Sequence, residues 1–299
     1  MALLIITTIL WAFSFSLIGE YLAGSVDSYF SVLMRVGLAA LVFPPFLRTR
    51  GQSPRTVVLY MLVGAMQLGI MYLLAFRAYI YLTVSEFLLF TVFTPLYITL
   101  IYDLLSGRKL RWGYLLSAAL AVLGAAIIRY DKVSDHFWTG LLLVQLSNLC
   151  FAIGMVGYKR LMEVRPMPQH NAFAWFYVGA FIVAVAAWFM LGNAQKLPTT
   201  TLQWSVLVWL GVVASGLGYF MWNYGATQVD AGTLGIMNNV HVPAGLLVNL
   251  AIWQEQPHWP SFISGALVIL ASLWVHRRWV APHSGQTADD RRRGSAQSE

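Results

Sequence analysis

The chain contains little charge, a single cysteine and none of the short motifs that mark common enzyme sites. Charged residues make up 10% of its 299 residues, against about 25% in soluble globular domains. A lone cysteine, Cys150, excludes an intramolecular disulfide and, inside an apolar run, indicates a packing role. No HExxH, P-loop, Gly-x-Ser-x-Gly or metal-spaced Cys/His cluster occurs, so no metal, no cofactor and no enzymatic activity are predicted.

What the chain has instead is a series of long apolar runs. Hydrophobic residues account for 59% of it, and each run is close to the roughly 20 residues that a helix needs to cross a bilayer. The ten runs span residues 2–22, 29–47, 56–78, 84–102, 110–128, 137–158, 171–191, 203–226, 232–253 and 260–279. Membrane β-strands would alternate apolar and polar residues, whereas these runs are apolar all round. We therefore predict an all-α membrane protein with ten transmembrane helices.

Lysine and arginine are unevenly distributed between the loops. If the ten helices alternate in direction, one side of the membrane carries 14 basic residues and the other carries three. By the positive-inside rule, both termini are predicted to be cytoplasmic in a bacterial-type inner membrane. The net charge of +7 is therefore explained by the orientation of the chain in the membrane, and no nucleic-acid partner is predicted. The polar, charged residues 283–299 are predicted to form a disordered cytoplasmic tail.

Two proline-containing segments reveal an internal repeat. Residues 93–96 and 241–244 carry Pro95 and Pro243, which are 148 residues apart, and the small-residue segments 117–123 and 264–270 align at an offset of 147. The repeat predicts two five-helix halves, residues 1–131 and 132–282. Because five is odd, the second half enters the membrane from the opposite side, so the halves are predicted to be inverted repeats. Inverted repeats provide two near-equivalent arrangements for alternating access, which indicates a transporter.

Both prolines lie near the middle of a predicted helix. Each leaves the carbonyl four residues earlier, that of Thr91 or Asn239, without its helical donor. A packing kink would explain either proline alone. Because proline recurs at corresponding places in both halves, we predict that Pro95 and Pro243 act as hinges or face a cavity. Glycines such as Gly154 and those of segment 211–218 predict close helix packing.

These features together resemble the drug/metabolite transporter superfamily. The resemblance rests on the ten helices in two halves, segment 10–14 (Leu-Trp-Ala-Phe-Ser), the two prolines and the small-residue fifth and tenth helices. Within the superfamily the chain resembles EamA-type carriers, most of all the bacterial aromatic amino-acid exporters, over nearly all of residues 2–279. Many EamA-type carriers place a glutamate just after helices four and nine. Glu255 matches the second place, whereas the first holds Asp103 or no acid.

No Asp, Glu, Lys or Arg is expected at the centre of a predicted helix. Glu20 with Arg35, and Arg77 with Glu86, are expected to pair near the outward-facing ends as structural or gate-locking pairs. The missing central carboxylate argues against an acidic proton relay, and against a fixed counter-ion for a strongly charged substrate. Facilitated export or exchange is therefore favoured over obligatory proton coupling, although His241 keeps coupling open.

Aromatic and amide residues at mid-depth form the predicted substrate site. Stripes of aromatic residues also occur as interfacial belts, but here Asn, Ser and Thr stand beside them where lipid contact would be costly. His241 and its neighbouring asparagines fit either the core of the helix bundle, where their hydrogen bonds are satisfied by other helices, or the wall of a cavity. The predicted substrate-binding residues are Trp11, Ser14, Tyr72, Phe76, Tyr79, Thr94, Asn148, Phe151, Tyr219, Trp222, Asn223, Asn238, Asn239 and His241.

The predicted function is that of a secondary transporter. By resemblance it exports aromatic and other apolar amino acids around a midplane cavity, in contact with membrane lipid and with no obligatory protein partner. A multidrug or sugar-derivative carrier of the same fold is the alternative. A lipid-modifying membrane enzyme is disfavoured because no nucleophile–base constellation is found, and a channel because no repeated ring of charges is found.

Overall fold

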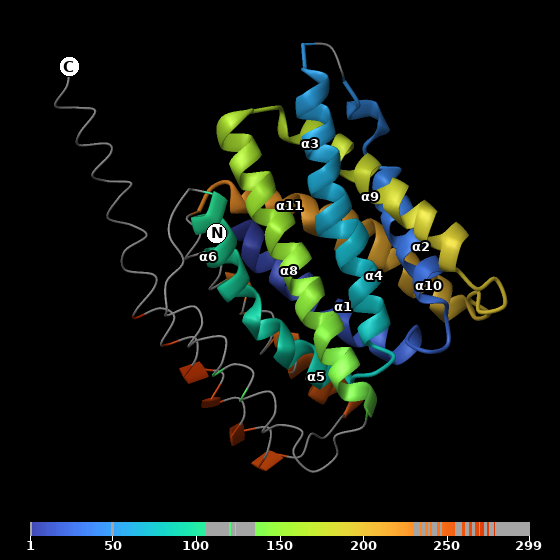
Figure 1. Ribbon diagram of the computed structural model, residues 1–299. Coiled ribbons are helices and arrows are strands. Elements are labelled where there is room, and N and C mark those ends of the chain that lie inside the picture. Colours follow the sequence, from blue (N-terminus) through green and yellow to red (C-terminus); the bar gives the residue numbers. More distant parts are fainter. Residues whose placement is uncertain are drawn as a thin grey trace.

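Long apolar helices make up the computed structural model of the protein, shown in Figure 1. The structure describes residues 2–48, 51–105, 120, 123 and 135–229, and scattered residues from 234 to 278. Within these residues it contains helices and no strand. The α-helices are α1 (Ala2–Tyr21), α2 (Ser28–Ala40), α3 (Pro54–Gly64), α4 (Met71–Ala78), α5 (Val84–Phe90), α6 (Thr94–Leu105), α8 (Asp135–Val164), α9 (Gln169–Leu191), α10 (Thr201–Trp209) and α11 (Gly218–Ala226). Shorter 3₁₀ or π segments are η1 (Pro44–Phe46), η2 (Ala65–Ile70), η3 (Thr91–Phe93), η4 (Leu210–Leu217) and η5 (Asn249–Trp253).

Six helices among the described residues are long and apolar enough to cross a membrane. They are Ala2–Tyr21, Pro54–Ala78, Val84–Leu105, His136–Val164, Gln169–Leu191 and Thr201–Ala226. The second predicted run, residues 29–47, differs from expectation because α2 ends at Ala40 and is a shorter apolar helix. Most of the predicted runs 110–128 and 260–279, and part of run 232–253, lie outside the described residues. The all-helical membrane fold is confirmed, while ten helices in two inverted halves stays a prediction.

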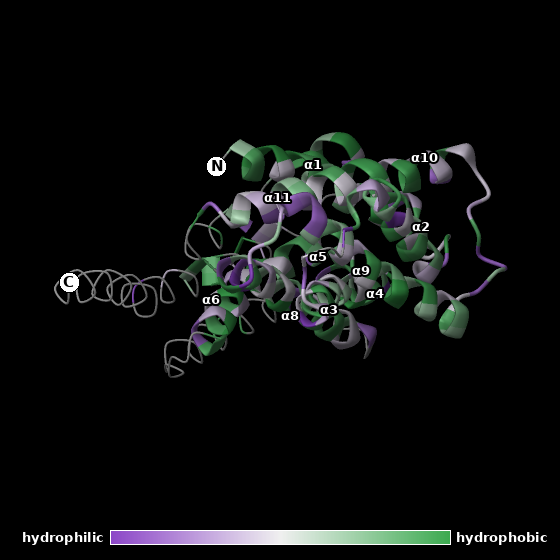
Figure 2. Cartoon of the chain, turned by 90° about the horizontal axis from the view of Figure 1, so that it is seen from above, coloured by the Kyte–Doolittle hydropathy of each residue, from purple (hydrophilic) through white to green (hydrophobic). Residues whose placement is uncertain are grey.

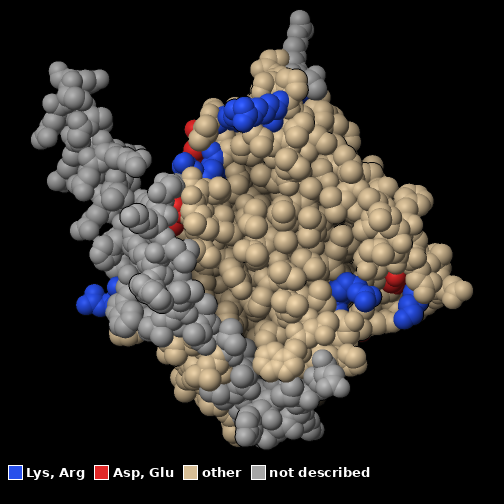
Figure 3. Space-filling view, viewed as in Figure 1, with Lys and Arg blue, Asp and Glu red and all other residues tan. Residues whose placement is uncertain are grey.

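The membrane-facing surface of the bundle is apolar. Hydrophobic residues predominate over most of the bundle in the hydropathy colouring of Figure 2, while α11 carries more polar residues. Charged side chains gather at the ends of the bundle and leave a broad uncharged surface between them (Figure 3). Exposed side chains such as Ile9, Leu62 and Phe189 are the ones that lipid would cover.

Two spans contain a π-helical segment near their middle, η2 between α3 and α4 and η4 between α10 and α11. Such segments disturb the regular hydrogen-bond ladder and often occur at functional sites. In η4, the carbonyl of Ala214 accepts a hydrogen bond from Trp11 Nε1 (2.9 Å), and that of Ser215 accepts one from the Tyr177 hydroxyl (2.6 Å). Side chains of other helices thus satisfy the backbone of η4, as a membrane interior requires.

The span from Val84 to Leu105 is interrupted by η3, directly before Pro95. Because proline has no N–H, the carbonyl of Thr91 loses its helical donor. The hydroxyl of Thr94 donates to that carbonyl instead, at 2.7 Å. The span thus changes from α-helix to 3₁₀-helix just before Pro95, and the hinge role of Pro95 stays a prediction. Pro243 lies outside the described residues.

Helices α3 and α9 pack so closely that their backbones touch at two glycines. A Cβ atom on Gly64 would lie 1.8 Å from the carbonyl oxygen of Phe176, and one on Gly179 would lie 1.9 Å from that of Met61. Gly154 of α8 packs closely against the span that contains η2. Small residues allow this approach between membrane helices. The contacts fix the spacing of the helices that surround the cavity described next.

Candidate functional site

A cavity lies between α1, α2, α4, α5, α6, α8 and α11, at the level of η3 and η4, with about 640 Å³ of empty space including the part open to solvent. Ten of the predicted substrate-binding residues line it: Trp11, Ser14, Tyr72, Phe76, Tyr79, Thr94, Asn148, Phe151, Tyr219 and Asn238. The wall is mostly aromatic and apolar, with a few polar groups, as is typical of sites for small organic molecules. The structure thus brings together most of the residues that the sequence singled out.

Of the other four predicted residues, the two that the structure describes, Trp222 and Asn223, do not line this cavity. Trp222 is fully buried, and its Nε1 donates to the sulfur of Met155 at 3.2 Å. Asn223 is fully buried and exchanges two hydrogen bonds with the amide of Gln67, at 3.0 and 3.1 Å. Asn239 and His241 lie outside the described residues. Trp222 and Asn223 therefore belong to the packed layer beneath the cavity.

Arg35 is the cavity residue that sequence reasoning placed wrongly. The run 29–47 put it near an outward-facing end, but α2 covers only Ser28–Ala40, so Arg35 lies at the middle of the helix and lines the cavity. Its side chain is 3% exposed. The expectation that no charged residue occupies a helix centre is therefore wrong. The tyrosine and phenylalanine stripe of α4 was the sequence signal that could have located Arg35, since α2 and α4 are neighbours.

The expected ion pairs also take other forms. Glu20 is exposed at the end of α1 and forms no ion pair with Arg35 in the described structure. Arg77 lies over the ring of Tyr29 at 5.9 Å. The carboxylate of Glu86 accepts a hydrogen bond from the backbone N–H of Thr83 in the capping box that begins α5. The pairs Glu20–Arg35 and Arg77–Glu86 were expected to lock the rim, and these contacts replace them.

A hydrogen-bonded network holds the Arg35 side chain in place. Arg35 Nε donates to Ser215 Oγ at 2.6 Å, and Ser215 Oγ and the Tyr72 hydroxyl are 2.9 Å apart. The guanidinium lies 4.1 Å from the centre of the Tyr72 ring, in a cation–π contact. Ser215 belongs to η4, so the π-helical segment positions a charged group at the cavity wall.

Trp11 forms the centre of an aromatic cluster at the base of the cavity. Its ring centroid lies 4.6 Å from that of Tyr219 and 5.0 Å from that of Trp222. Phe151 of α8 meets both Trp11 and Tyr219 edge-on, at 6.3 Å. Tilted and edge-to-face contacts of this kind are the preferred arrangements of aromatic rings. The cluster gives the cavity a rigid apolar floor.

Two polar atoms of cavity residues have no hydrogen-bond partner in the described structure, the hydroxyl of Tyr79 and Nδ2 of Asn238. Tyr79 is 5% exposed and stacks on Phe87 at 4.2 Å, and Asn238 is 2% exposed. Buried polar groups without a partner are rare and costly. Both residues therefore carry an unused hydrogen-bonding group in the wall of the cavity.

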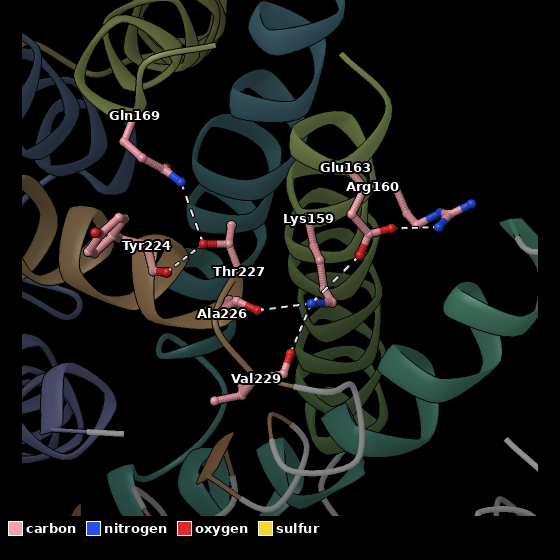
Figure 4. Close-up of polar contacts among 8 residues, drawn as sticks. All are labelled: Lys159, Arg160, Glu163, Gln169, Tyr224, Ala226, Thr227 and Val229. Atoms are coloured by element: carbon pink, nitrogen blue, oxygen red, sulfur yellow. Dashed lines mark hydrogen bonds and ion pairs between the residues drawn. The ribbon is translucent and has the colours of Figure 1, made fainter. Parts of the chain in front are cut away.

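Polar contacts join α8 and α11 at the end of the bundle where both helices finish (Figure 4). Lys159 Nζ donates to the carbonyl oxygens of Val229 (2.9 Å) and Ala226 (3.3 Å), and lies 3.7 Å from a carboxylate oxygen of Glu163. An ammonium group at the C-terminus of a helix is stabilising because the terminal carbonyls carry partial negative charge. This contact ties α11 to α8.

Replacing Lys159 with methionine is expected to lower the stability of the protein by about 1–2 kcal/mol, because the carbonyls that end α11 lose a charged donor. The thermal unfolding midpoint of detergent-purified protein measures the effect. Arg160→Met is the matched control, since Arg160 pairs with the same Glu163 from a partly exposed position, where an ion pair contributes little. Equal midpoints for the two variants would contradict the prediction.

An all-helical membrane fold with a mostly apolar cavity among its described helices is typical of carriers for small solutes. Two stretches of the chain, residues 1–130 and 138–277, match the EamA-like transporter family, and the protein belongs to that family. It is therefore a transporter and not an enzyme.

Relatives of known name cover almost the whole chain. A protein of Escherichia coli (strain K12) named biotin transporter is 83% identical over 299 residues, covering 100% of both chains. A probable biotin transporter of Pseudomonas aeruginosa is 55% identical over 279 residues, which are 93% of this chain and 97% of that one. A probable terminal-alkyne amino-acid exporter of Streptantibioticus cattleyicolor is 21% identical, covering 92% of each chain. A solved crystal structure with 17% identity matches at a TM-score of 0.64 over 92% of this chain and 95% of its own, and supports the fold alone.

Proposed function

We propose that this protein transports biotin across a bacterial inner membrane. The observation that carries the proposal is the 83% identity, over the entire length, to a protein named biotin transporter. A second named relative, at 55% identity, supports the same substrate. At such identity the residues around a central cavity are expected to be largely shared.

The chemistry of the cavity suits biotin. Biotin carries one carboxylate on an aliphatic chain, a thioether ring and an uncharged cyclic urea. Among the described residues that line it, the cavity offers one cation, Arg35, an aromatic floor around Trp11, and the unpartnered polar groups of Tyr79 and Asn238. A cation for the acid, apolar walls for the chain and ring, and hydrogen-bonding groups for the urea match the three parts of the molecule.

Export of aromatic and other apolar amino acids is the second candidate, favoured by the aromatic cavity and by the relative named as an amino-acid exporter. An amino acid brings a carboxylate and an ammonium group into the site. Among the described residues that line the cavity there is no Asp or Glu to pair with the ammonium. Burying an unpaired charge is costly. The cavity therefore favours a monocarboxylate such as biotin over a zwitterion.

We propose alternating access between two inverted halves as the mechanism, with both termini cytoplasmic. The two separate family matches, one in each half, support the repeat. Among described residues, Arg48, Arg55, Lys159, Arg160 and Arg165 lie at or near the end of the bundle where α3 begins and α8 finishes, whereas Arg77 and Lys196 lie towards the opposite end. This asymmetry supports a cytoplasmic location for the first end by the positive-inside rule.

Purified protein in liposomes is expected to take up labelled biotin with saturable kinetics. Excess unlabelled biotin should compete, and excess phenylalanine should not, because phenylalanine carries an ammonium group that the cavity does not pair. Protein-free liposomes give the background rate. Uptake of labelled phenylalanine that biotin fails to inhibit would favour the amino-acid candidate and reject biotin as the substrate.

A further inference from the structure

We propose that Arg35 is the residue that binds the substrate's carboxylate and makes the carrier specific for monocarboxylates with an uncharged polar end. This inference rests on the proposed function and assigns a part of the substrate to a named side chain. It comes from the geometry around α2, α4 and η4.

The first argument is the missing counter-ion. Arg35 is 3% exposed and lines the cavity. No Asp or Glu of the described residues forms an ion pair with it. A guanidinium keeps its charge in proteins, and a buried charge is costly unless it is paired. A carboxylate ligand in the cavity would supply the pair that the described residues do not.

The second argument is orientation. The Nε–H of Arg35 is occupied by Ser215, whose hydroxyl also contacts that of Tyr72. Ser215 is itself held in place, because its carbonyl accepts a hydrogen bond from Tyr177. The Nη groups of Arg35 donate to no described residue, so four of the five guanidinium donors are available. Two of them can bind both oxygens of a carboxylate in the parallel geometry typical of arginine.

The third argument is the placement of other polar groups. Tyr79 and Asn238 line the same cavity and carry the unpartnered polar atoms. A hydroxyl and an amide suit the uncharged carbonyl and N–H groups of a polar head. The rings of Tyr72 and Phe76 flank the guanidinium, at 4.1 and 5.9 Å from Cζ, and reduce its contact with water. The site therefore fits a single negative charge at one end of the ligand and neutral polar groups at the other.

The test compares biotin with biotinamide, in which an uncharged amide replaces the carboxylate. Binding is measured by ligand-induced thermal stabilisation of purified protein, with titration to obtain apparent affinities. Wild-type protein is expected to bind biotin about tenfold to a hundredfold more tightly than biotinamide, since charge-assisted hydrogen bonds to the acid are lost. Arg35→Gln is expected to weaken biotin binding by a similar factor and to leave biotinamide binding nearly unchanged. Arg35→Lys keeps the charge without the planar fork, so its affinity for biotin should lie between those of the wild type and Arg35→Gln.

Arg77→Gln is the matched control, since Arg77 lies near the end of α4 and outside the cavity lining. It should keep the preference of the wild type for biotin. Equal affinity of wild-type protein for biotin and biotinamide would overturn the assignment of the carboxylate to Arg35 and leave the proposed function intact. This comparison requires no variant to fold. If Arg35→Gln is folded, as judged by gel filtration, but binds neither biotin nor biotinamide, the proposal is also overturned.

A second pair of ligands tests carboxylate binding by Arg35 independently of the proposed function. Phenylacetate and phenylacetamide differ in the same way, and neither carries an ammonium group. If biotin does not bind while phenylacetate is preferred over its amide in an Arg35-dependent manner, the proposed function fails, and the role of Arg35 in binding a carboxylate is supported. If neither carboxylate is preferred over its amide, the proposal that Arg35 binds the carboxylate fails.

Discussion

Replacing Gly64 with alanine is expected to prevent the protein from folding into a stable carrier. The added Cβ would lie 1.8 Å from the carbonyl oxygen of Phe176 and 2.5 Å from its carbonyl carbon. These are backbone atoms of α9, which cannot rotate away as the end of a side chain could. The two helices would have to separate, at a cost of about 3 kcal/mol, the upper end of the usual range for overpacking, and the packing that supports α2 and α4 around the cavity would loosen. Gly179→Ala should have the same effect, since its Cβ would lie 1.9 Å from the carbonyl oxygen of Met61.

Fluorescence-detected gel filtration of tagged protein in detergent measures the yield of folded carrier. The control is Gly216→Ala, in a buried part of η4, where the nearest atom would lie 3.4 Å from the new Cβ, an ordinary contact distance. That variant should give a monodisperse peak at a yield near that of the wild type. A wild-type yield and melting midpoint for Gly64→Ala would contradict the close contact of α3 and α9.

The long apolar runs predicted the helical membrane fold because run length and composition are local properties of the sequence. Close packing was predictable only in part. Gly154 and Gly211 stand near other small residues and were expected at helix contacts, where the structure places them. Gly64 and Gly179 were not singled out from the sequence, and each meets a partner more than a hundred residues away. Their importance follows from the crossing of α3 with α9, which no local pattern reveals.

The cavity was largely predictable, because aromatic residues mixed with Asn, Ser and Thr at mid-depth are unfavourable against lipid. The role of Arg35 was not, because its depth was judged from an apolar run that continues past the end of α2. The run extends to residue 47, while the helix ends at Ala40 and is followed by η1 (Pro44–Phe46). Hydrophobicity marks where chain can lie in a membrane, whereas depth depends on where the helix stops.

The amide pair of Gln67 and Asn223 is expected to behave as a coupled unit in a double-mutant cycle. Both side chains are fully buried, and each donates to the other, at 3.0 and 3.1 Å. Asn223→Leu leaves the amide of Gln67 without a partner and should destabilise the protein by roughly 1–3 kcal/mol, as should Gln67→Met. The double variant replaces both polar groups by apolar ones of similar size. It should recover much of the loss, because no buried amide is left unsatisfied.

The same cycle decides between two roles for Asn223, which shares a helix face with the cavity residue Tyr219 and was predicted to bind substrate. If Asn223 acts only in packing, the double variant should bind biotin with the affinity of the wild type once its stability recovers. If it binds substrate, biotin affinity should stay reduced in the double variant, and Gln67→Met alone should leave it unchanged. Thermal midpoints and biotin titrations on the same four proteins separate these outcomes. Losses of stability that simply add in the double variant would show that the two amides are not coupled. Because the pair joins the span containing η2 to α11 directly beneath the cavity, we expect strong coupling in stability and wild-type affinity for biotin.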